Sequence, residues 1–180
     1  DVYQRQAQLS VVFPGYPRPL AGESEGATRY RRNRDGAHVD GLLPVGPDRR
    51  RKVLEPHAYI LGVPLTNSAS KASPLVVWDG SHDIMRSAFE RELKAHPPES
   101  WSDADLTEVY QHARAEVFAS CRRVELPVRV GETILLHPML VHGIAPWSAA
   151  DVEPRAVAYF RPMTDIATWL AGTGVCFPVG

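Results

Sequence analysis

The tripeptide His38-Val39-Asp40 has the clearest chemical potential in this 180-residue sequence. Side chains two positions apart on a β-strand point to the same face, so a strand here would place an imidazole and a carboxylate in one cavity. A nitrogen and an oxygen ligand on one face are two thirds of the facial triad that binds Fe(II) and leaves open positions. His-x-Asp is a weak signal by itself, because it is frequent by chance and also fits a polar turn after Asp35-Gly36.

A third ligand has to come from a distant segment, and the sequence offers His137 and His142. Downstream, Arg155 begins a β-like run that ends at Arg161. A buried guanidinium can hold a carboxylate through two parallel hydrogen bonds. The ordered set of His-x-Asp, a long interval with helices, His-Gly and then Arg is much rarer than any one of its parts.

Three segments together resemble the phytanoyl-CoA dioxygenase-like family of Fe(II)/2-oxoglutarate-dependent oxygenases. They are Gly36-Ala37-His38-Val39-Asp40-Gly41, Leu75-Val76-Val77-Trp78-Asp79-Gly80-Ser81-His82, and residues 131–143 followed by Arg155. The resemblance implies that His38, Asp40 and His142 are the iron ligands and the catalytic centre. It favours His142 over His137, because the family's ligand histidine precedes a glycine. It assigns Arg155 to the distal carboxylate of the co-substrate 2-oxoglutarate.

The sequence departs from the family at three places. Asp79 stands where relatives have a proline before Gly-Ser-His, and Trp147 stands where an asparagine often follows the distal His-Gly. The interval from His142 to Arg155 is also long, which leaves Arg161 as a second candidate for the carboxylate partner. His82 is a candidate for binding cofactor or substrate, and it equally fits a loop residue at the start of a helix.

The resemblance implies an enzyme that hydroxylates a small or medium organic substrate with dioxygen and releases succinate and carbon dioxide. Two alternatives stay open. One is a cupin-like metalloenzyme that needs no 2-oxoglutarate, and the other is a jelly roll that binds without catalysis. The basic run Arg49-Arg50-Arg51-Lys52 fits a solvated loop, or a site mouth that attracts an anionic substrate. We expect substrate specificity to depend on loops 14–28, 44–56 and 66–74.

Composition indicates one globular domain over residues 1–180. The net charge of −1 and the pI near 6.7 give no basic field for nucleic acid or a membrane surface. No apolar run has the length of a membrane span, and neither a signal-like segment nor a disulfide framework is visible. We therefore expect a cytoplasmic protein, and the sequence is silent on its oligomeric state.

The pattern of short apolar runs separated by prolines and glycines favours an α+β, mainly β fold. By resemblance, its core is a double-stranded β-helix, also called a jelly roll, with two inserted or flanking helices. We predict a strand pair around Asp35-Gly36 within 30–43, and strands at 57–66, 75–78, 124–130, 133–137 and 155–161. Helices are predicted over 83–96 and from Ser102, where Asp105 would complete a capping box.

Overall fold

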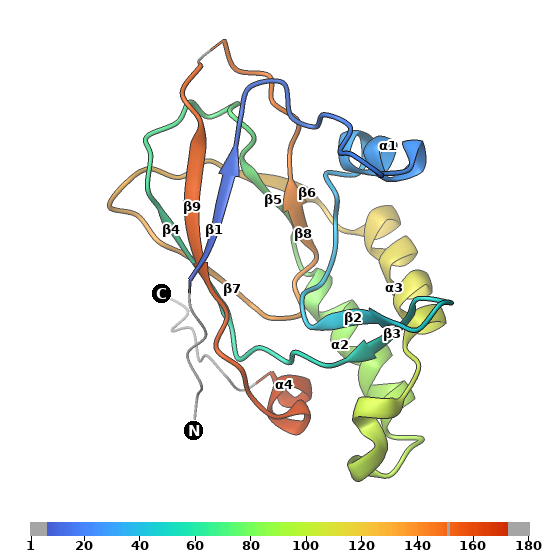
Figure 1. Ribbon diagram of the computed structural model, residues 1–180. Helices are drawn as coiled ribbons and strands as arrows, with labels where there is room; N and C mark the ends of the chain where they lie inside the picture. The colour runs from blue at the N-terminus through green and yellow to red at the C-terminus, as the bar shows by residue number, and fades with distance from the viewer. Residues whose placement is uncertain (1–6, 151, 173–180) are drawn as a thin grey trace.

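Two antiparallel sheets form the centre of the computed structural model, which describes residues 7–150 and 152–172. The larger sheet has the strand order β1 (Gln8–Val12), β9 (Arg155–Phe160), β4 (Ile60–Pro64) and β7 (Ile134–Leu136). The smaller has the order β6 (Arg123–Leu126), β5 (Leu75–Trp78) and β8 (His142–Ile144), and β2 (Leu42–Val45) pairs with β3 (Arg50–Val53) in a hairpin. The described part is thus a mixed α/β fold built on antiparallel sheets (Figure 1).

One apolar cluster joins the two sheets. It combines Ile60, Ile134, Val157 and others of the larger sheet with Leu75 and Val77 of the smaller sheet. A second cluster lies on the other side of the smaller sheet, where Val76 and Trp78 are packed with helix residues. Strand β5 is therefore buried on both faces, which explains why it is apolar at every position.

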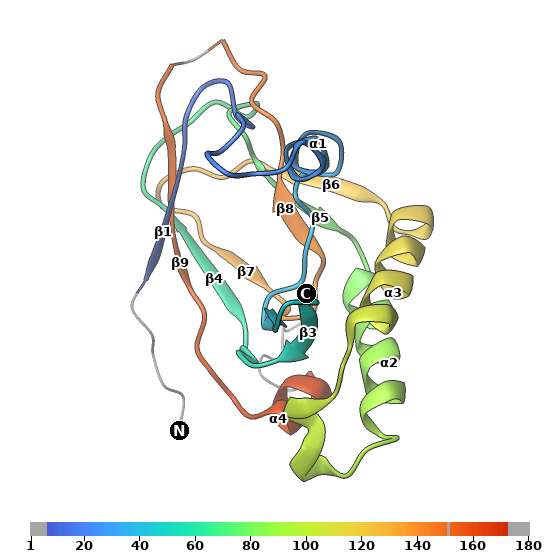
Figure 2. The same cartoon turned by 45° about the vertical axis from the view of Figure 1, so that its right-hand side comes forward.

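Helices α2 (Ser81–Leu93) and α3 (Thr107–Ser120) cover that outer face of the smaller sheet (Figure 2). The predicted helix over 83–96 is confirmed, with Met85, Phe89 and Leu93 on its buried side. The predicted start of the second helix at Ser102 is wrong. Residues Pro98–Asp103 form a 3₁₀ helix, and Asp105 accepts a hydrogen bond from the backbone N–H of Thr107 where α3 begins.

The predicted strand pair within 30–43 is also wrong in its first half, because Glu25–Asn33 form helix α1. Ser24 caps this helix by accepting a hydrogen bond from the N–H of Ala27, and Arg31 and Arg32 lie in its last turn, where cations stabilise it. The prediction rested on the turn signal at Asp35-Gly36, which indicates a turn but not which element precedes it. The turn at Asp35-Gly36 is present, with both residues at positive φ.

The later strands follow the prediction more closely, although β6 ends at Leu126 and not at Val130. Pro127 follows Leu126 and has no N–H for the ladder, which accounts for the early end. A short helix α4 (Ile166–Ala171) packs Trp169 and Leu170 into the helical cluster. No helix among the described residues has both the length and the apolar character that a membrane crossing requires.

Candidate metal centre

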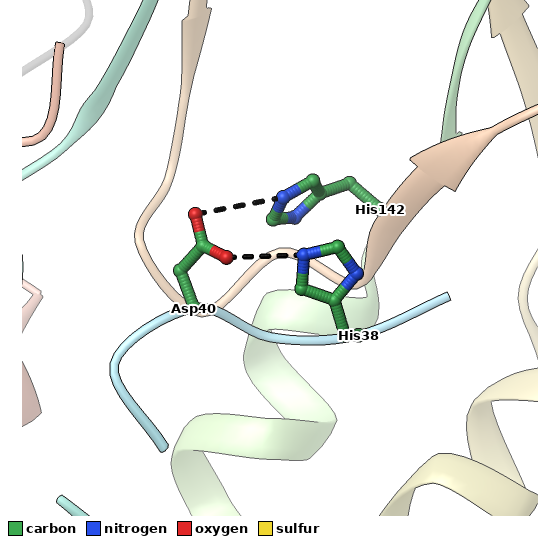
Figure 3. Close-up of side chains that lie close together, drawn as sticks. All are labelled: His38, Asp40 and His142. Atoms are coloured by element: carbon green, nitrogen blue, oxygen red, sulfur yellow. Dashed lines mark ion pairs between the residues drawn. The ribbon is translucent and has the colours of Figure 1, made fainter. Parts of the chain in front are cut away.

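The structure brings His38, Asp40 and His142 together, as Figure 3 shows. One potential ligand atom from each residue lies within 4.8 Å of the others. The Nε2 of His38 is 3.1 Å from one carboxylate oxygen of Asp40, and the Nε2 of His142 is 3.7 Å from the other. Adjacent ligands about 2.1 Å from an octahedral metal lie roughly 3 Å apart, so this spacing fits a divalent cation.

Both imidazoles are held by the ring nitrogen that faces away from the cluster. The Nδ1 of His38 is 2.9 Å from the carbonyl oxygen of Gly36, and the Nδ1 of His142 is 2.9 Å from that of Leu140. A carbonyl oxygen only accepts, so each Nδ1 carries a proton and each Nε2 is the ring nitrogen turned toward the cluster. Metal-binding histidines are oriented in this manner by their outer hydrogen bond.

An antiparallel bridge fixes the distance between the two histidines. The N–H of each donates to the carbonyl oxygen of the other, at 2.9 and 3.0 Å. His38 lies outside the strands and is paired with His142 through this single bridge. Asp40 lies in the turn before β2. The alternation expected of a strand still holds, because Ala37 and Val39 enter the helical core while His38 and Asp40 face the other way.

Two glycines let neighbouring segments approach the ligands closely. A Cβ on Gly143 would lie 2.3 Å from the carbonyl oxygen of Asp35, which accepts the N–H of Ile144. A Cβ on Gly41 would lie 2.7 Å from the carbonyl oxygen of Glu55, and Gly41 has a φ of 91°. The Asp-Gly and His-Gly pairs of the sequence therefore have a steric cause.

An ion pair supports the segment that carries His38 and Asp40. Arg123 on β6 donates two hydrogen bonds to the carboxylate of Asp35, at 2.7 and 2.9 Å. The Asp35 side chain is 7% exposed, whereas that of Arg123 is 39% exposed. This bidentate ion pair holds Asp35, at the start of the turn, against β6 of the smaller sheet.

Ser81, and not His82, is the residue of the Gly-Ser-His segment that contacts the neighbourhood of His142. The fully buried Ser81 hydroxyl accepts the N–H of Val141, immediately before the ligand candidate. The ring of His82 lies 4.8 Å from that of His137, and neither belongs to the three-residue cluster. The sequence interpretation missed this positioning role of Ser81, although its place between Gly80 and a helix start was a visible signal.

The charges in the cluster favour an ionised carboxylate. Burial lowers the pKa of His38, but the hydrogen bond with Asp40 and the Asp40 charge raise it by more. Burial raises the pKa of Asp40, but the hydrogen bond with His38 and the nearby cationic groups lower it by a larger amount. The resulting pKa of Asp40 is far below the usual range of an aspartate. Burial, aided by His38, lowers the pKa of His142 to about 4. The His142 ring is therefore neutral near pH 7, as a metal ligand must be.

Arg161 follows β9 and points to the cluster. Its Nε donates to a carboxylate oxygen of Asp40 at 2.5 Å, and its Nη1 donates to the side-chain oxygen of Gln8 at 2.8 Å. Carboxylate ligands of metals are commonly hydrogen-bonded in this way, which restricts their rotation. Arg161 thus lies against a candidate ligand.

Arg155 lies at the other end of β9 with its side chain buried between the sheets. Its Nη2 is 3.2 Å from the hydroxyl oxygen of Tyr159, while its buried Nη1 has no hydrogen-bond partner. Tyr159 also lines a cavity of about 200 Å³ beside His38 and His142. Arg155 itself lines a separate recess of about 10 Å³. A buried cationic donor without a partner is costly, so the surroundings of Arg155 suit an anionic group.

The cavity wall includes two residues of β1 that the sequence interpretation missed, Gln8 and Ser10. Their signal was the alternation of polar Gln8 and Ser10 with apolar Leu9 and Val11. None of the loops expected to set specificity, at 14–28, 44–56 and 66–74, lines this cavity in the described part of the chain.

The basic run is engaged in contacts and does not border this cavity. Arg50 and Lys52 lie 3.4 and 3.5 Å from the carboxylates of Asp105 and Asp103. Arg51 donates to the carbonyl oxygen of Leu42 and lies over the ring of Tyr110. These partners fasten the β2–β3 hairpin to the helical layer.

Comparison with known proteins gives only distant likenesses. No protein-family model matches the chain, and no curated protein matches it. Among solved structures, AviO1 from Streptomyces viridochromogenes Tue57 is 19% identical with a TM-score of 0.47, covering 91% of this chain and 51% of its own. The non-heme alpha ketoglutarate dependent carbocyclase SnoK from nogalamycin biosynthesis is 18% identical with a TM-score of 0.49, covering 90% and 49%.

HygX from Streptomyces hygroscopicus, solved with nickel, 2-oxoglutarate and hygromycin B bound, is 18% identical with a TM-score of 0.38. That match covers 72% of this chain and 50% of HygX. The chain spans about half the length of the solved proteins AviO1, SnoK and HygX. These scores are too low to assign a fold or an activity.

We expect Gly143→Ala to separate His38 from His142, because the new Cβ would meet a backbone oxygen. The variant should lose about 1–3 kcal/mol of unfolding free energy and bind Co(II) more weakly in an absorbance titration. Gly26→Ala is the matched control, because Gly26 lies in α1 with no atom closer than 3.9 Å to its added Cβ. Equal Co(II) affinity in both variants would contradict the steric role of Gly143.

Arg123→Met should destabilise the protein, because it leaves the Asp35 carboxylate buried without its bidentate partner. We expect a loss of roughly 1–3 kcal/mol in chemical denaturation, with weaker Co(II) binding. The adjacent Arg122→Met removes an ion pair whose side chains are 77% and 61% exposed, so it should have little effect. If the two variants behave alike, the pair does not support the metal centre.

Proposed function

We propose that this protein is an Fe(II)- and 2-oxoglutarate-dependent oxygenase that hydroxylates a small or medium organic substrate. The observation that carries the proposal is the convergence of two Nε2 atoms and one carboxylate on a single point beside a cavity. Two histidines and one carboxylate with open positions are the donor set of non-haem Fe(II) oxygenases. The facing antiparallel sheets are consistent with the jelly roll that the sequence resemblance implies.

His38, Asp40 and His142 would hold the iron on one face and leave the remaining positions open toward the cavity. The carbonyl oxygens of Gly36 and Leu140 keep both rings in the binding tautomer. Arg161 would hold the Asp40 carboxylate in place and balance its charge.

Arg155 would bind the distal carboxylate of 2-oxoglutarate, with the free Nη1 as one donor. The hydroxyl of Tyr159 lies beside the same guanidinium and lines the cavity, so it is suited to share that carboxylate. Arg155 is favoured over Arg161 for this role because Arg161 already donates to Asp40 and Gln8.

When bound, the iron and 2-oxoglutarate supply the oxidising chemistry, in which dioxygen yields succinate, carbon dioxide and a hydroxylated substrate. The chain's own contribution is to orient the ligands, bind the co-substrate carboxylate and line the cavity in which the reaction takes place. The apolar side chains of Leu75 and Ile144 and the polar ends of Gln8 and Ser10 line the same cavity.

Two alternatives make different predictions in one assay. A cupin-like enzyme would turn over without producing succinate, and a non-catalytic jelly roll would bind metal without consuming 2-oxoglutarate. The iron-loaded protein in air should slowly convert 2-oxoglutarate to succinate even without its primary substrate. Tight metal binding without any succinate would exclude the proposed activity.

Anaerobic addition of Fe(II) and 2-oxoglutarate should produce a weak visible charge-transfer band. We expect His142→Ala and His38→Ala to abolish this band, because each removes one of three ligands. His137→Ala is the matched control and should retain it, since His137 lies against His82 and outside the cluster. A band that survives in His142→Ala but not in His137→Ala would reverse the ligand assignment.

Arg155→Gln should raise the apparent Michaelis constant for 2-oxoglutarate about 10- to 100-fold, the equivalent of one charge-assisted interaction of roughly 1.5–3 kcal/mol. The maximal rate of succinate formation should change less. In Tyr159→Phe the guanidinium remains, so the increase should be smaller. An unchanged constant in Arg155→Gln would mean that Arg161 or another group binds the carboxylate.

A further inference from the structure

Strand β1 has the reverse of the polarity expected at a protein surface. Its polar residues Gln8 and Ser10 point inward and line the cavity, while Leu9 and Val11 point outward and are 60% and 40% exposed. A strand with one face in water normally presents polar residues on that face.

Strand β9 repeats this reversal beside it. Arg155 and Tyr159 point into the interior together with the apolar Val157. The alternate positions Ala156, Ala158 and Phe160 point outward. The outward positions carry no polar side chain, and Phe160 is 36% exposed.

The other two strands of the larger sheet continue the same outer surface. On β4, Leu61 and Val63 point outward, and Leu65 follows directly after the strand with 51% of its surface exposed. On β7, Leu135 points outward and is 37% exposed. Every outward position of the four strands is therefore apolar and uncharged.

The strand register makes these side chains one continuous patch, which we call the outer apolar face. Ala158 is paired with Leu9 on one side and with Val63 on the other. Leu61 is paired with Phe160 and with Leu135. The patch thus crosses the larger sheet from one edge to the other.

The outer apolar face exposes more apolar surface than is usual for a protein surface that faces water. A large apolar side chain has roughly 150–250 Å² of surface, and at the fractions above the face exposes on the order of 500 Å². The equivalent outer face of the smaller sheet is covered by α2 and α3 (Figure 2). No described helix covers the larger sheet in either view.

We propose that the outer apolar face is a dimer interface, covered by the same face of a second copy of this chain. A partner for this surface must itself be apolar and uncharged, and a second copy supplies such a surface at equal concentration. A twofold axis that lies between the two faces makes the contact self-complementary, so that the assembly ends at two copies. Two such faces would bury roughly 1,000 Å², which reaches the lower limit for a specific interface, and sheets pack face to face in this manner.

This contact would also stabilise the wall of the cavity. Strand β1 lies at the edge of its sheet and pairs only with β9 among the described strands. A second copy against Leu9 and Val11 would hold β1 in place, and with it the inward-pointing Gln8 and Ser10.

The test is the mass of the full chain in solution, measured by light scattering and by sedimentation over a range of concentrations. We expect twice the monomer mass of 19.9 kDa. Leu9→Lys and Leu65→Lys each bury a charge in an apolar contact and should raise the dimer dissociation constant about 100-fold or more. Leu54→Lys is the matched control, because Leu54 is 44% exposed and lies after β3, away from the face.

A dimer that Leu9→Lys and Leu65→Lys dissociate, and that Leu54→Lys retains, would support the proposal. Circular dichroism and Co(II) binding would verify that the dissociated variants remain folded. A parent chain that is monomeric at every concentration would overturn it, as would a dimer that neither face variant weakens. Open-ended association of the parent would also overturn it, because a twofold contact closes at two copies.

Discussion

The backbone bridge between His38 and His142 is the contact on which the candidate site depends. Two hydrogen bonds join residues that are more than 100 positions apart, and they set the spacing of the imidazoles before any side-chain contact forms. This bridge needs the His38 segment to lie directly against β8. Gly143 permits that approach, while Asp35, Arg123 and Ser81 hold the two segments from either side.

The ligand candidates could be found from the sequence, but the route by which they meet could not. Local spacing indicated that His38 and Asp40 share a face, and the structure agrees, although a bridge and a turn replace the expected strand. The pairing of His38 with His142 is a long-range contact, so no periodicity in either segment encodes it. Only resemblance to a family favoured His142 over His137, and the structure brings His142 to the cluster.

The errors in the fold have the same origin. Helix α1 was missed because the Asp35-Gly36 turn was interpreted as the turn of a strand pair and the cap at Ser24 was not recognised, and β6 was predicted too long because alternation continues past Pro127. Alternation reports which faces are apolar, whereas caps and prolines report where hydrogen bonding begins and ends. The larger sheet adds a further difficulty, because its outward positions are apolar while Gln8, Ser10 and Arg155 face inward beside an apolar cluster.

Two arginines lie at opposite ends of β9, with Arg155 at its first position and Arg161 directly after its last, and their surroundings differ in a way that separates their roles. Arg161 has its donors occupied by Asp40 and Gln8, so its charge already has a partner within the cluster. Arg155 is the more deeply buried of the two, donates to the neutral hydroxyl of Tyr159, and has a buried Nη1 without a partner among the described residues. Burying a charge without an opposite charge is expensive, and it is tolerated where an anion completes the site. The same strand therefore presents one guanidinium suited to a protein carboxylate and one suited to a carboxylate that arrives with a ligand, which supports a co-substrate such as 2-oxoglutarate over a site that binds metal alone.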